Sequence, residues 1–483
     1  MNLGKLHRYN KKDETRMLQD NVAVLQPLDF DRNLISQHNG KGPRYTSYPT
    51  ADRFAVMDAH TYEQSVLQQQ PGTRIKPLSL YFHLPFCNTI CYYCACNKVI
   101  TKDQSKADQY LDYLLKEVKL QSALLTKRGT VSQLHFGGGT PTFLNDLQLS
   151  RLMEGIRTHF DLKADGEFSI EIDPRKVSAA TVAHLGSIGF NRMSVGIQDF
   201  NLEVQQAVNR VQSEEETRIV IDAARANGFK SVSIDLIYGL PHQSQASMYQ
   251  TIEKVLTLRP DRLALYSYAH LPERFMPQRR IDAGQLPSTE GKLDILQSSV
   301  NQLLAAGYVY IGMDHFSLPD DALAIAQRRG QLHRNFQGYS THADCDLMAF
   351  GVSAIGKVAN CFAQNVKDLD TYYQYLDADR LPVDRGLLMG HDDFLRGSVI
   401  QSLMCQFELG FRSVEVSYLI DFKSYFSDEL KLLAPYQDDG LLVLRDDSIT
   451  ITAKGRFLVR SIAMVFDRYL RHAAPAGRYS KLI

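Results

Sequence analysis

The sequence lacks net charge and lacks any long apolar run. Lys and Arg together number 54, and so do Asp and Glu. A surface that binds nucleic acid or an anionic membrane is usually strongly basic, so the balanced charge argues against both classes, although it is compatible with a local basic pocket. No apolar run approaches the roughly 18 residues of a membrane-spanning helix. Residues 1–33 lack the apolar core of a secretory signal, and Asp13, Glu14 and Asp20 are unlike a transit peptide.

A disulfide framework is also missing. The chain has seven cysteines, an odd number, and four of them fall within residues 87–96. Small secreted proteins spread an even number of cysteines along the chain, so this clustering argues against secretion. It indicates instead a metal or cluster site in a reducing compartment, and we expect the protein to be cytoplasmic.

The chain alternates short β-rich segments with longer helical ones from residue 78 onward. This alternation predicts a parallel sheet with right-handed crossovers. Its 483 residues, of which 44% are apolar, allow about three domains and a large core. The expected strands are residues 78–84, 131–136, 167–173, 192–197, 232–237 and 262–268, and the clearest helices are 106–127, 146–160, 214–227 and 248–256.

Chemically unusual residues stand at the carboxyl end of all six expected strands. They are the cysteine cluster, the glycines 137–139, Glu171 and Asp173, Gln198 and Asp199, Asp235, and Ala269 with His270. An open doubly wound sheet would concentrate such residues at one switch point, whereas a barrel collects them around its mouth. We therefore expect an α/β fold, a partial (β/α)6 barrel with a mainly helical C-terminal domain.

The remaining segments suggest a division of the chain into three parts. Residues 1–37 form a polar N-terminal extension, residues 38–365 the barrel domain, and residues 366–483 a helical cap with a small β-hairpin. Near the end of the barrel we expect one more strand and two glycine-bearing loops, and in the cap a hairpin followed by a last helix. These segments are residues 309–316 (strand), 333–339 and 350–356 (loops), 441–444 with 449–452 (hairpin) and 455–471 (helix).

The order of helices and hairpin in the cap also resembles a winged helix. A DNA-binding role is disfavoured because the wing would present four acidic residues to phosphate. These are Asp438, Asp439, Asp446 and Asp447. A structural cap on the barrel is the simpler interpretation.

The cysteine cluster has the pattern C-x3-C-x2-C-x-C, formed by Cys87, Cys91, Cys94 and Cys96. Three thiolates at this spacing can bind one face of a 4Fe-4S cluster and leave one iron open to a small-molecule ligand. A structural zinc site usually joins two separated ligand pairs, and none is visible here. A ferredoxin-type cluster would need a distant fourth ligand. Three further cysteines are candidates, but each is more simply interpreted as a buried thiol: Cys345, Cys361 and Cys405.

These cysteines belong to a longer series of motifs. Together they resemble the oxygen-independent coproporphyrinogen III oxidases, also called coproporphyrinogen dehydrogenases, which are radical S-adenosylmethionine (SAM) enzymes of heme (porphyrin) biosynthesis. The resemblance runs from about residue 38 to the C-terminus. The motifs are residues 42–50 (GPRYTSYPT), 81–98 (YFHLPFCNTICYYCACNK), 135–142 (HFGGGTPT), 170–175 (IEIDPR), 196–200 (GIQDF), 234–241 (IDLIYGLP), 268–272 (YAHLP), 312–316 (GMDHF) and 333–339 (HRNFQGY).

The resemblance implies roles for individual residues. Cys87, Cys91 and Cys94 would ligate the cluster, and Cys96 would be a motif residue with a catalytic role rather than a ligand. The family places two SAM molecules in the pocket. Residues expected at the cluster-bound SAM are Tyr81, Gly138, Glu171, Ala269 and Ile355, and those expected at the second SAM are Tyr93, Gly139, Thr140, Gln198, Arg210 and Asp235.

Several of these roles have simpler alternatives. The glycines allow a ligand to approach the backbone, but they are also typical of a tight turn. Glu171 and Asp235 suit ribose or amino groups, but acids more often cap helices or form salt bridges. Arg210 is also compatible with a solvated helix position. Tyr93 stands where relatives often have Phe.

The resemblance implies coproporphyrinogen III as substrate, with two propionates converted to vinyl groups by a 5′-deoxyadenosyl radical. A molecule with four carboxylates needs cations, and Arg offers the matching geometry. Arg44 is the first candidate and Arg334 the second, with Tyr45 lining the same region; an intraprotein salt bridge is the alternative for either arginine. A closed pocket is also needed, because a carbon radical would react with exposed groups.

Other functions compatible with this scaffold remain open. A heme-binding trafficking chaperone shares the three-cysteine pattern, but such relatives typically carry an aromatic residue where this chain has Cys96. A radical SAM enzyme acting on RNA would predict a basic extension, which the balanced charge does not support. We therefore expect an oxidoreductase without a nucleic-acid partner or a membrane span, monomeric as in the family. Its electron donor and acceptor leave no mark on the sequence.

Overall fold

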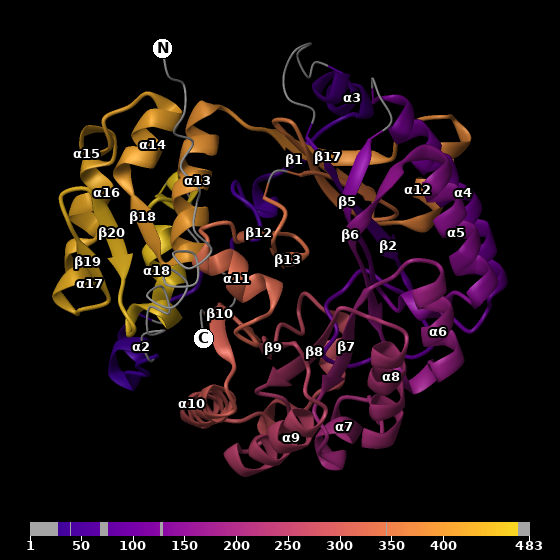
Figure 1. Cartoon of the computed structure of the whole chain (residues 1–483), viewed down its shortest axis with the longest axis horizontal. Helices are drawn as coiled ribbons and strands as arrows, with labels where there is room; N and C mark the ends of the chain where they lie inside the picture. The colour runs from indigo at the N-terminus through magenta and orange to yellow at the C-terminus, as the bar shows by residue number, and fades with distance from the viewer. Residues whose placement is uncertain (1–27, 39, 68–75, 126–128, 344, 472–483) are drawn as a thin grey trace, which may run out of the picture.

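The computed structural model describes residues 28–38, 40–67, 76–125, 129–343 and 345–471 (Figure 1). Its main feature is one 13-stranded sheet in the order β1-β17-β16-β15-β14-β2-β5-β6-β7-β8-β9-β11-β10. Six neighbouring strands in the middle of this order are parallel, and the sheet is open at its ends. They are β2 (Leu78–Leu84), β5 (Thr130–Gly138), β6 (Asp161–Ile172), β7 (Arg192–Gln198), β8 (Ser231–Tyr238) and β9 (Arg262–Ser267). The predicted partial (β/α)6 barrel is thereby confirmed.

Helices cover the outer face of the parallel strands (Figure 1). Their starts follow local chemistry, because α5, α8 and α9 each begin with a capping box, in which the side chains of the cap and the third helical residue satisfy backbone N–H groups. The sequence prediction missed α6, α7 and α10. The helices of the barrel are α4 (Ser105–Ala123), α5 (Asp146–His159), α6 (Ala179–Ser187), α7 (Leu202–Ala207), α8 (Glu214–Ala226), α9 (Gln245–Thr257) and α10 (Thr289–Ala305).

Side chains of the barrel strands alternate between two environments. In β8, Val232, Ile234 and Leu236 are fully buried among apolar neighbours, whereas Ser233 and Asp235 face the barrel interior. This period-two pattern directs polar groups inward and apolar groups toward the helices. The interior is therefore a polar cavity suited to chemistry, while the core lies between sheet and helices.

The sheet continues past the six barrel strands on the side of β2. There β14 pairs with β2 in parallel, and β15, β16, β17 and β1 follow as antiparallel neighbours. Strand β17 lies beyond the boundary expected at residue 365, and the division of the chain into domains stays a prediction. These strands are β14 (Asp346–Phe350), β15 (Ile355–Val358), β16 (Cys361–Asn365), β17 (Val383–Leu388) and β1 (Ala55–Val56).

Two local predictions near the other edge were wrong. The single strand expected over residues 309–316 is a hairpin of β10 (Val309–Gly312) and β11 (His315–Ser317), because Gly312 and Met313 take positive φ values of 144° and 54° and reverse the chain. The loop expected over residues 333–339 is a second hairpin, in which β12 (His333–Asn335) pairs with β13 (Gly338–Ser340).

The C-terminal part packs beside the barrel and shares one continuous apolar core with it. The predicted hairpin is present and gains a third strand, β18. The helix expected over residues 455–471 is instead divided into a short 3-10 turn and two α-helices. The elements are α13 (His391–Gln406), β18 (Glu408–Gly410), α14 (Phe411–Tyr418), α15 (Phe422–Tyr425), α16 (Ser427–Leu432), α17 (Ala434–Asp438), β19 (Leu442–Leu444), β20 (Ser448–Ile451), α18 (Val459–Met464) and α19 (Arg468–Arg471).

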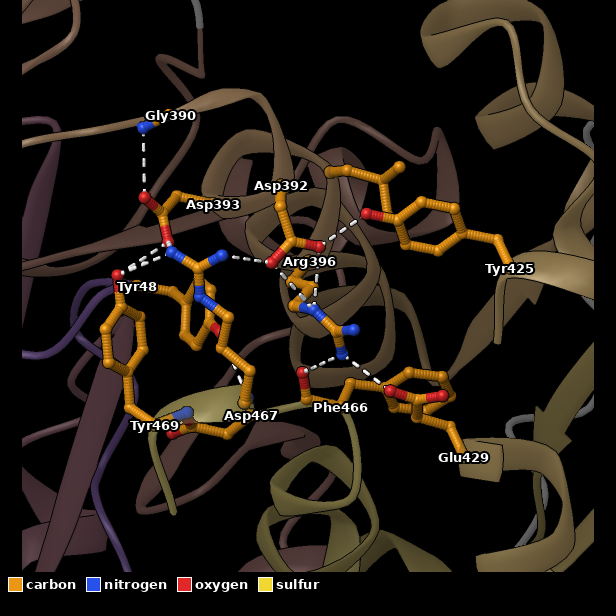
Figure 2. Close-up of polar contacts among 12 residues, drawn as sticks. Tyr48, Gly390, Asp392, Asp393, Arg396, Tyr425, Glu429, Phe466, Asp467 and Tyr469 are labelled. Atoms are coloured by element: carbon orange, nitrogen blue, oxygen red, sulfur yellow. Dashed lines mark hydrogen bonds and ion pairs between the residues drawn. The ribbon is translucent and has the colours of Figure 1, made fainter. Parts of the chain in front are cut away.

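The N-terminal segment lies against this C-terminal part. Arg460 donates to the carbonyl oxygens of Gly42 and Pro43, and the Tyr45 hydroxyl donates to Asp467 at 3.0 Å. Tyr48 contributes to a polar network that also includes the carboxylates and arginine of α13 (Figure 2). The GPRYTSYPT motif thus connects the barrel to the C-terminal helices.

Of the polar N-terminal extension expected over residues 1–37, residues 1–27 lie outside the described part of the chain. The described remainder leads into α2 (Arg32–His38), where Arg32 pairs with Asp294 on α10. In the described ranges, no helix combines the length and apolarity that crossing a bilayer would require.

Candidate functional site

The four clustered cysteines lie on the loop between β3 (Phe86–Cys87) and β4 (Val99–Ile100), two short strands that pair in parallel. Backbone contacts fix this loop, since the Tyr92 N–H donates to the Val208 carbonyl at 3.0 Å and Asn209 donates to the Ile90 carbonyl at 2.7 Å. The loop closes a cavity of about 180 Å³ at the carboxyl ends of the barrel strands. Twelve of the predicted site residues line this cavity: Cys87, Cys91, Tyr93, Cys94, Cys96, Gly138, Gly139, Thr140, Glu171, Gln198, Arg210 and Asp235.

Positive groups and donors surround the cysteine sulfurs. Nη1 of Arg210 lies 3.7 Å and Nη2 of Arg175 3.9 Å from Sγ of Cys91, and the Thr140 hydroxyl lies 3.4 Å from Sγ of Cys87. Such groups stabilise thiolates. A hydrogen bond from Cys96 is the largest of the effects that lower the pKa of Cys94 to about 6.

This donor set fits an iron–sulfur cluster. In a 4Fe-4S cluster each thiolate binds a different iron, so the sulfurs surround a space rather than one point. Within the described ranges, no three His, Cys, Asp or Glu side chains gather as ligands of a single metal ion would. Cys87, Cys91 and Cys94 could therefore hold a cluster, with Arg175 and Arg210 offsetting its negative charge.

The glycine run lets the backbone approach the cavity closely. Gly138 has a φ of 114°, in the left-handed region that favours glycine. A Cβ atom on Gly139 would lie 2.6 Å from the carbonyl carbon and oxygen of Pro85, which no other residue could tolerate without moving the backbone. The glycines are thus required by the fold of the cysteine loop and also leave one wall of the cavity without side chains.

Two carboxylates face this cavity with different charge states. Glu171 accepts from the Gly138 N–H at 3.1 Å and lies 3.3 Å from Nε2 of His135. Burial would raise the pKa of Glu171, but these two partners bring it below its ordinary value. Among the described residues Asp235 has the Ser194 hydroxyl as its one hydrogen-bond partner, at 2.9 Å, and burial raises its pKa to about 7. The pair therefore offers one ionised acceptor beside one group that titrates near neutrality.

An ion cluster lies beneath the cysteine loop. Arg210 contacts Asp173 at 3.1 Å and donates to the Gly196 carbonyl at 2.7 Å, and the Arg175 guanidinium donates to both carboxylate oxygens of the same Asp173. The Asp173 carboxylate keeps a pKa below its ordinary value, since the arginines outweigh the effect of burial. Asp173, Arg175 and Ser194 were not among the predicted site residues, although the IEIDPR motif contains the first two.

Three predicted cofactor contacts lie outside the lining of this cavity. Tyr81 stacks on His135 with ring centroids 5.9 Å apart and bonds to His83 at 3.1 Å. Ala269 lies two residues beyond the end of β9. Ile355 belongs to β15 and packs in a small apolar cluster with Phe336.

The predicted substrate residues belong to a second, basic region. Arg44 pairs with Asp314, and the Arg334 Nε donates to the Arg44 carbonyl at 3.3 Å. Burial, followed by the charges of Arg44 and Arg334, lowers the pKa of Arg460 to about 9, so the three guanidiniums lie close together. Tyr45 instead directs its hydroxyl to Asp467. Sequence reasoning missed Arg460, because it lies more than 400 residues from Arg44 and belongs to no motif that relates the two.

Comparisons with known proteins place the whole chain beside one group of relatives. Residues 81–255 match the Radical SAM superfamily and residues 389–458 the HemN C-terminal domain. The chain is 51% identical to the oxygen-independent coproporphyrinogen III oxidase of Pseudomonas aeruginosa and 50% to that of Escherichia coli K12, in each case over 95% of this chain and 100% of the relative. A solved structure of the Escherichia coli coproporphyrinogen III oxidase, described as a radical SAM enzyme, superposes with a TM-score of 0.88 at 48% identity, covering 92% of this chain and 100% of that one.

Proposed function

This chain belongs to the oxygen-independent coproporphyrinogen III oxidase family of radical SAM enzymes, and from that premise we propose that it converts two propionate side chains of coproporphyrinogen III to vinyl groups, giving protoporphyrinogen IX. Membership of the radical SAM superfamily implies a 4Fe-4S cluster and SAM as cofactors. The observation that carries the proposal is the convergence of Cys87, Cys91 and Cys94 with the glycine wall and the Glu171–Asp235 pair on one cavity. A structural zinc site would not require such a cavity.

When bound, the reduced cluster and SAM together supply a 5′-deoxyadenosyl radical. A propionate β-carbon of the substrate then loses a hydrogen atom, and release of CO2 and one electron leaves the vinyl group. The electron must pass to an acceptor, which is unidentified, as is the donor that reduces the cluster. The protein's part is to hold the reacting groups together in a closed site, so that the radical meets only the intended carbon.

The residues around the cavity divide by the group they would hold. Cys87, Cys91 and Cys94 would leave one iron open for SAM, and the ionised Glu171 would accept hydrogen bonds from that SAM beside Tyr81, Gly138, Ala269 and Ile355. A second SAM would lie against Arg210 and Asp235, together with Tyr93, Gly139, Thr140 and Gln198. Close approach of the Gly138 and Gly139 backbone supports both placements. Cys96 would act in turnover without binding iron.

The basic region beside the barrel interior would bind the substrate. Arg44 lies under Tyr266, with 5.9 Å between the guanidinium carbon and the ring centroid, and Tyr266 lines the interior together with Glu171 and Asp235. A propionate held by Arg44 would therefore be near the cofactor cavity. Tyr45 would support the site from behind, through Asp467.

The names of the relatives favour this activity over the heme-binding chaperone. We further propose that the enzyme works in the cytoplasm as a monomer, as its reducing chemistry and family suggest. An RNA-modifying activity has no support in the balanced charge.

An anaerobic assay tests the proposed function. The purified protein, reconstituted with iron and sulfide and reduced, is supplied with SAM and coproporphyrinogen III, and CO2 and protoporphyrinogen IX are measured. We expect two CO2 per substrate converted. A cluster-replete protein that binds heme but releases no CO2 would refute the oxidase and favour the chaperone.

A further inference from the structure

A cavity of about 490 Å³ lies outside the cofactor cavity and shares no lining residue with it. It is bounded by the N-terminal segment at Thr46–Tyr48, by Ser79 at the start of β2, by the β12–β13 hairpin and by α13. In Figure 1 this hairpin lies between the barrel and the C-terminal helices. Its turn also separates the cavity from the barrel interior, because Phe336 lines the former and Gln337 the latter. The cavity is thus adjacent to the reaction site.

Two cations, the partly buried Lys357 and the buried Arg334, line this cavity without an ion pair to a carboxylate among the described residues. The Lys357 ammonium lies over the rings of Phe362 and Phe394, at 5.5 and 6.0 Å, and has no ion pair or side-chain hydrogen bond. Burial lowers its pKa. Arg334 is 3% exposed, and its Nη1 has no hydrogen-bond partner. Buried cations left in this way are costly unless a ligand pairs with them.

The two acidic residues of the cavity are engaged elsewhere. Figure 2 shows the Asp393 carboxylate held by Tyr469 and by the Gly390 N–H, and Arg468 adds an ion pair at 2.9 Å. Asp346 accepts from the Ala359 N–H at 3.2 Å and pairs with Lys76 at 3.9 Å. Neither acid forms an ion pair with Lys357 or Arg334 among the described residues, although the charge of Asp346 partly offsets the effect of burial on the pKa of Lys357. With Lys76, Arg334 and Lys357 against Asp346 and Asp393, the cavity has a surplus of positive charge.

The rest of the lining mixes polar and apolar side chains. Phe336, Phe362, Phe394 and Met389 form its aromatic and apolar part, and neutral polar groups such as Ser79, Asn335 and Gln401 complete it. A lining of this kind suits a flat apolar body that carries separated carboxylates, and the volume is within the range of small-molecule sites. Strand β15 carries both Lys357 and Ile355, which is proposed above to contact the cluster-bound SAM. The two residues lie two positions apart and therefore on the same face of the strand.

We propose that this cavity binds carboxylates of the tetrapyrrole substrate that are not reacting, with Lys357 and Arg334 as their cationic anchors. The proposal rests on the function proposed above and assigns a role to Lys357 that the sequence did not indicate. Arg334 connects the two basic regions, since it lines this cavity and also bonds to the Arg44 backbone. The substrate would then extend from the barrel interior past the β12–β13 turn.

A binding titration with coproporphyrin III, the oxidised tetracarboxylate analogue of the substrate, tests this inference. The full-length, cluster-replete protein is added to the porphyrin, and quenching of the porphyrin fluorescence gives the Kd. We expect Lys357→Met and Arg334→Gln each to raise the Kd at least tenfold, and Lys357→Arg to restore most of the affinity. The tetramethyl ester should bind the wild type and Lys357→Met equally weakly. Lys254→Met is the matched control, because Lys254 also lies over an aromatic ring, Phe200 at 6.0 Å, but outside the cavity.

Two further measurements separate the possible failures. Lys357→Met should be at least as stable to heat as the wild type, because it removes an unpaired ammonium group. Its dithionite-driven formation of 5′-deoxyadenosine without substrate should be unchanged, and the two results together would show that the variant is folded and its cofactor site intact. Unchanged Kd values in both anchor variants, with a wild type that releases CO2, would overturn this inference alone. A wild type that binds coproporphyrin III through Lys357 but releases no CO2 from coproporphyrinogen III would overturn the proposed activity and leave the anchors standing.

Discussion

Replacing Asp235 by Asn should stabilise the protein while impairing its function. Asp235 is buried with one hydrogen bond from Ser194, and burial raises its pKa from the ordinary 3.8 to about 7. Below pH 3.8 the carboxyl group is protonated in both the folded and the unfolded state. As the pH rises toward 7 the unfolded chain releases this proton and the folded one keeps it, so stability falls. At ~1.4 kcal/mol per pKa unit, the full penalty above pH 7 is about 4 kcal/mol.

Asparagine has nearly the same shape, can accept from Ser194 and cannot ionise. The difference in unfolding free energy between Asp235→Asn and the wild type should therefore grow in favour of the variant by about 2–3 kcal/mol between pH 5 and pH 8. Urea unfolding of the apoprotein, followed by circular dichroism at each pH, measures this difference. Asp222→Asn, at a side chain 63% exposed on α8, is the control for the substitution itself.

Parallel stability profiles of Asp235→Asn and the wild type across this pH range would refute the reasoning. The functional half of the prediction is a loss of CO2 release in the variant at pH 8. A buried acid that lowers stability near neutral pH is retained where a ligand uses its charge or its proton. A variant that is both more stable and fully active would show that Asp235 has no such task.

Three more predictions follow from the site and its surroundings. Alanine at Cys87, Cys91 or Cys94 should abolish the visible absorbance of the reconstituted cluster, whereas Cys96→Ala should keep the cluster and lose CO2 release; loss of the cluster in Cys96→Ala would make it a ligand. Gly139→Ala places a Cβ 2.6 Å from the Pro85 backbone and should weaken SAM binding at least tenfold, measured by equilibrium dialysis. Gly228→Ala, at an open position with a positive φ, is the control for folding. Glu117 is fully buried and accepts four hydrogen bonds, from Gly351, Tyr372, Asn365 and Gln121. Glu117→Gln places an amide donor opposite these donors and should lower the unfolding free energy by about 1–3 kcal/mol. Urea denaturation measures this loss, and an unchanged midpoint would contradict the expectation.

The parts of the fold that depend on local pattern could be predicted from the sequence. Strand β2 has the expected bounds of residues 78–84, because a short apolar run bounded by Pro77 and Pro85 has one plausible structure. The gathering of Cys87, Cys91 and Cys94 at one cavity also follows from their spacing, and their role as cluster ligands stays a prediction. The missed helix α10 carries a signal of the same kind, since Leu293, Leu296, Val300 and Leu303 recur at helical spacing.

Features that depend on distant contacts could not be predicted. The turn at Gly312 and Met313 interrupts a run that reads as one strand, and only its pairing with β9 shows where the chain reverses. Arg460 joins the basic region through the backbone of Gly42 and Pro43, and no spacing relates these residues. Lys357 is an ordinary lysine in sequence. Its proposed role follows from the structure, which shows that the acids near it, Asp346 and Asp393, bind other groups.

The balanced charge of the chain conceals a separation of charge in space. Arg44, Arg334 and Arg460 come from the N-terminal segment, the β12–β13 hairpin and the C-terminal part. The charge of Arg334 lowers the pKa of Arg44, and the charges of both lower the pKa of Arg460. Gathering like charges in a buried region costs free energy, which a carboxylate ligand would offset. Because no single segment supplies more than one of these arginines, the basic region exists only when all three parts are docked. Binding of a tetracarboxylate would then stabilise the docked arrangement by linkage, and the two halves of the chain should unfold more cooperatively in its presence.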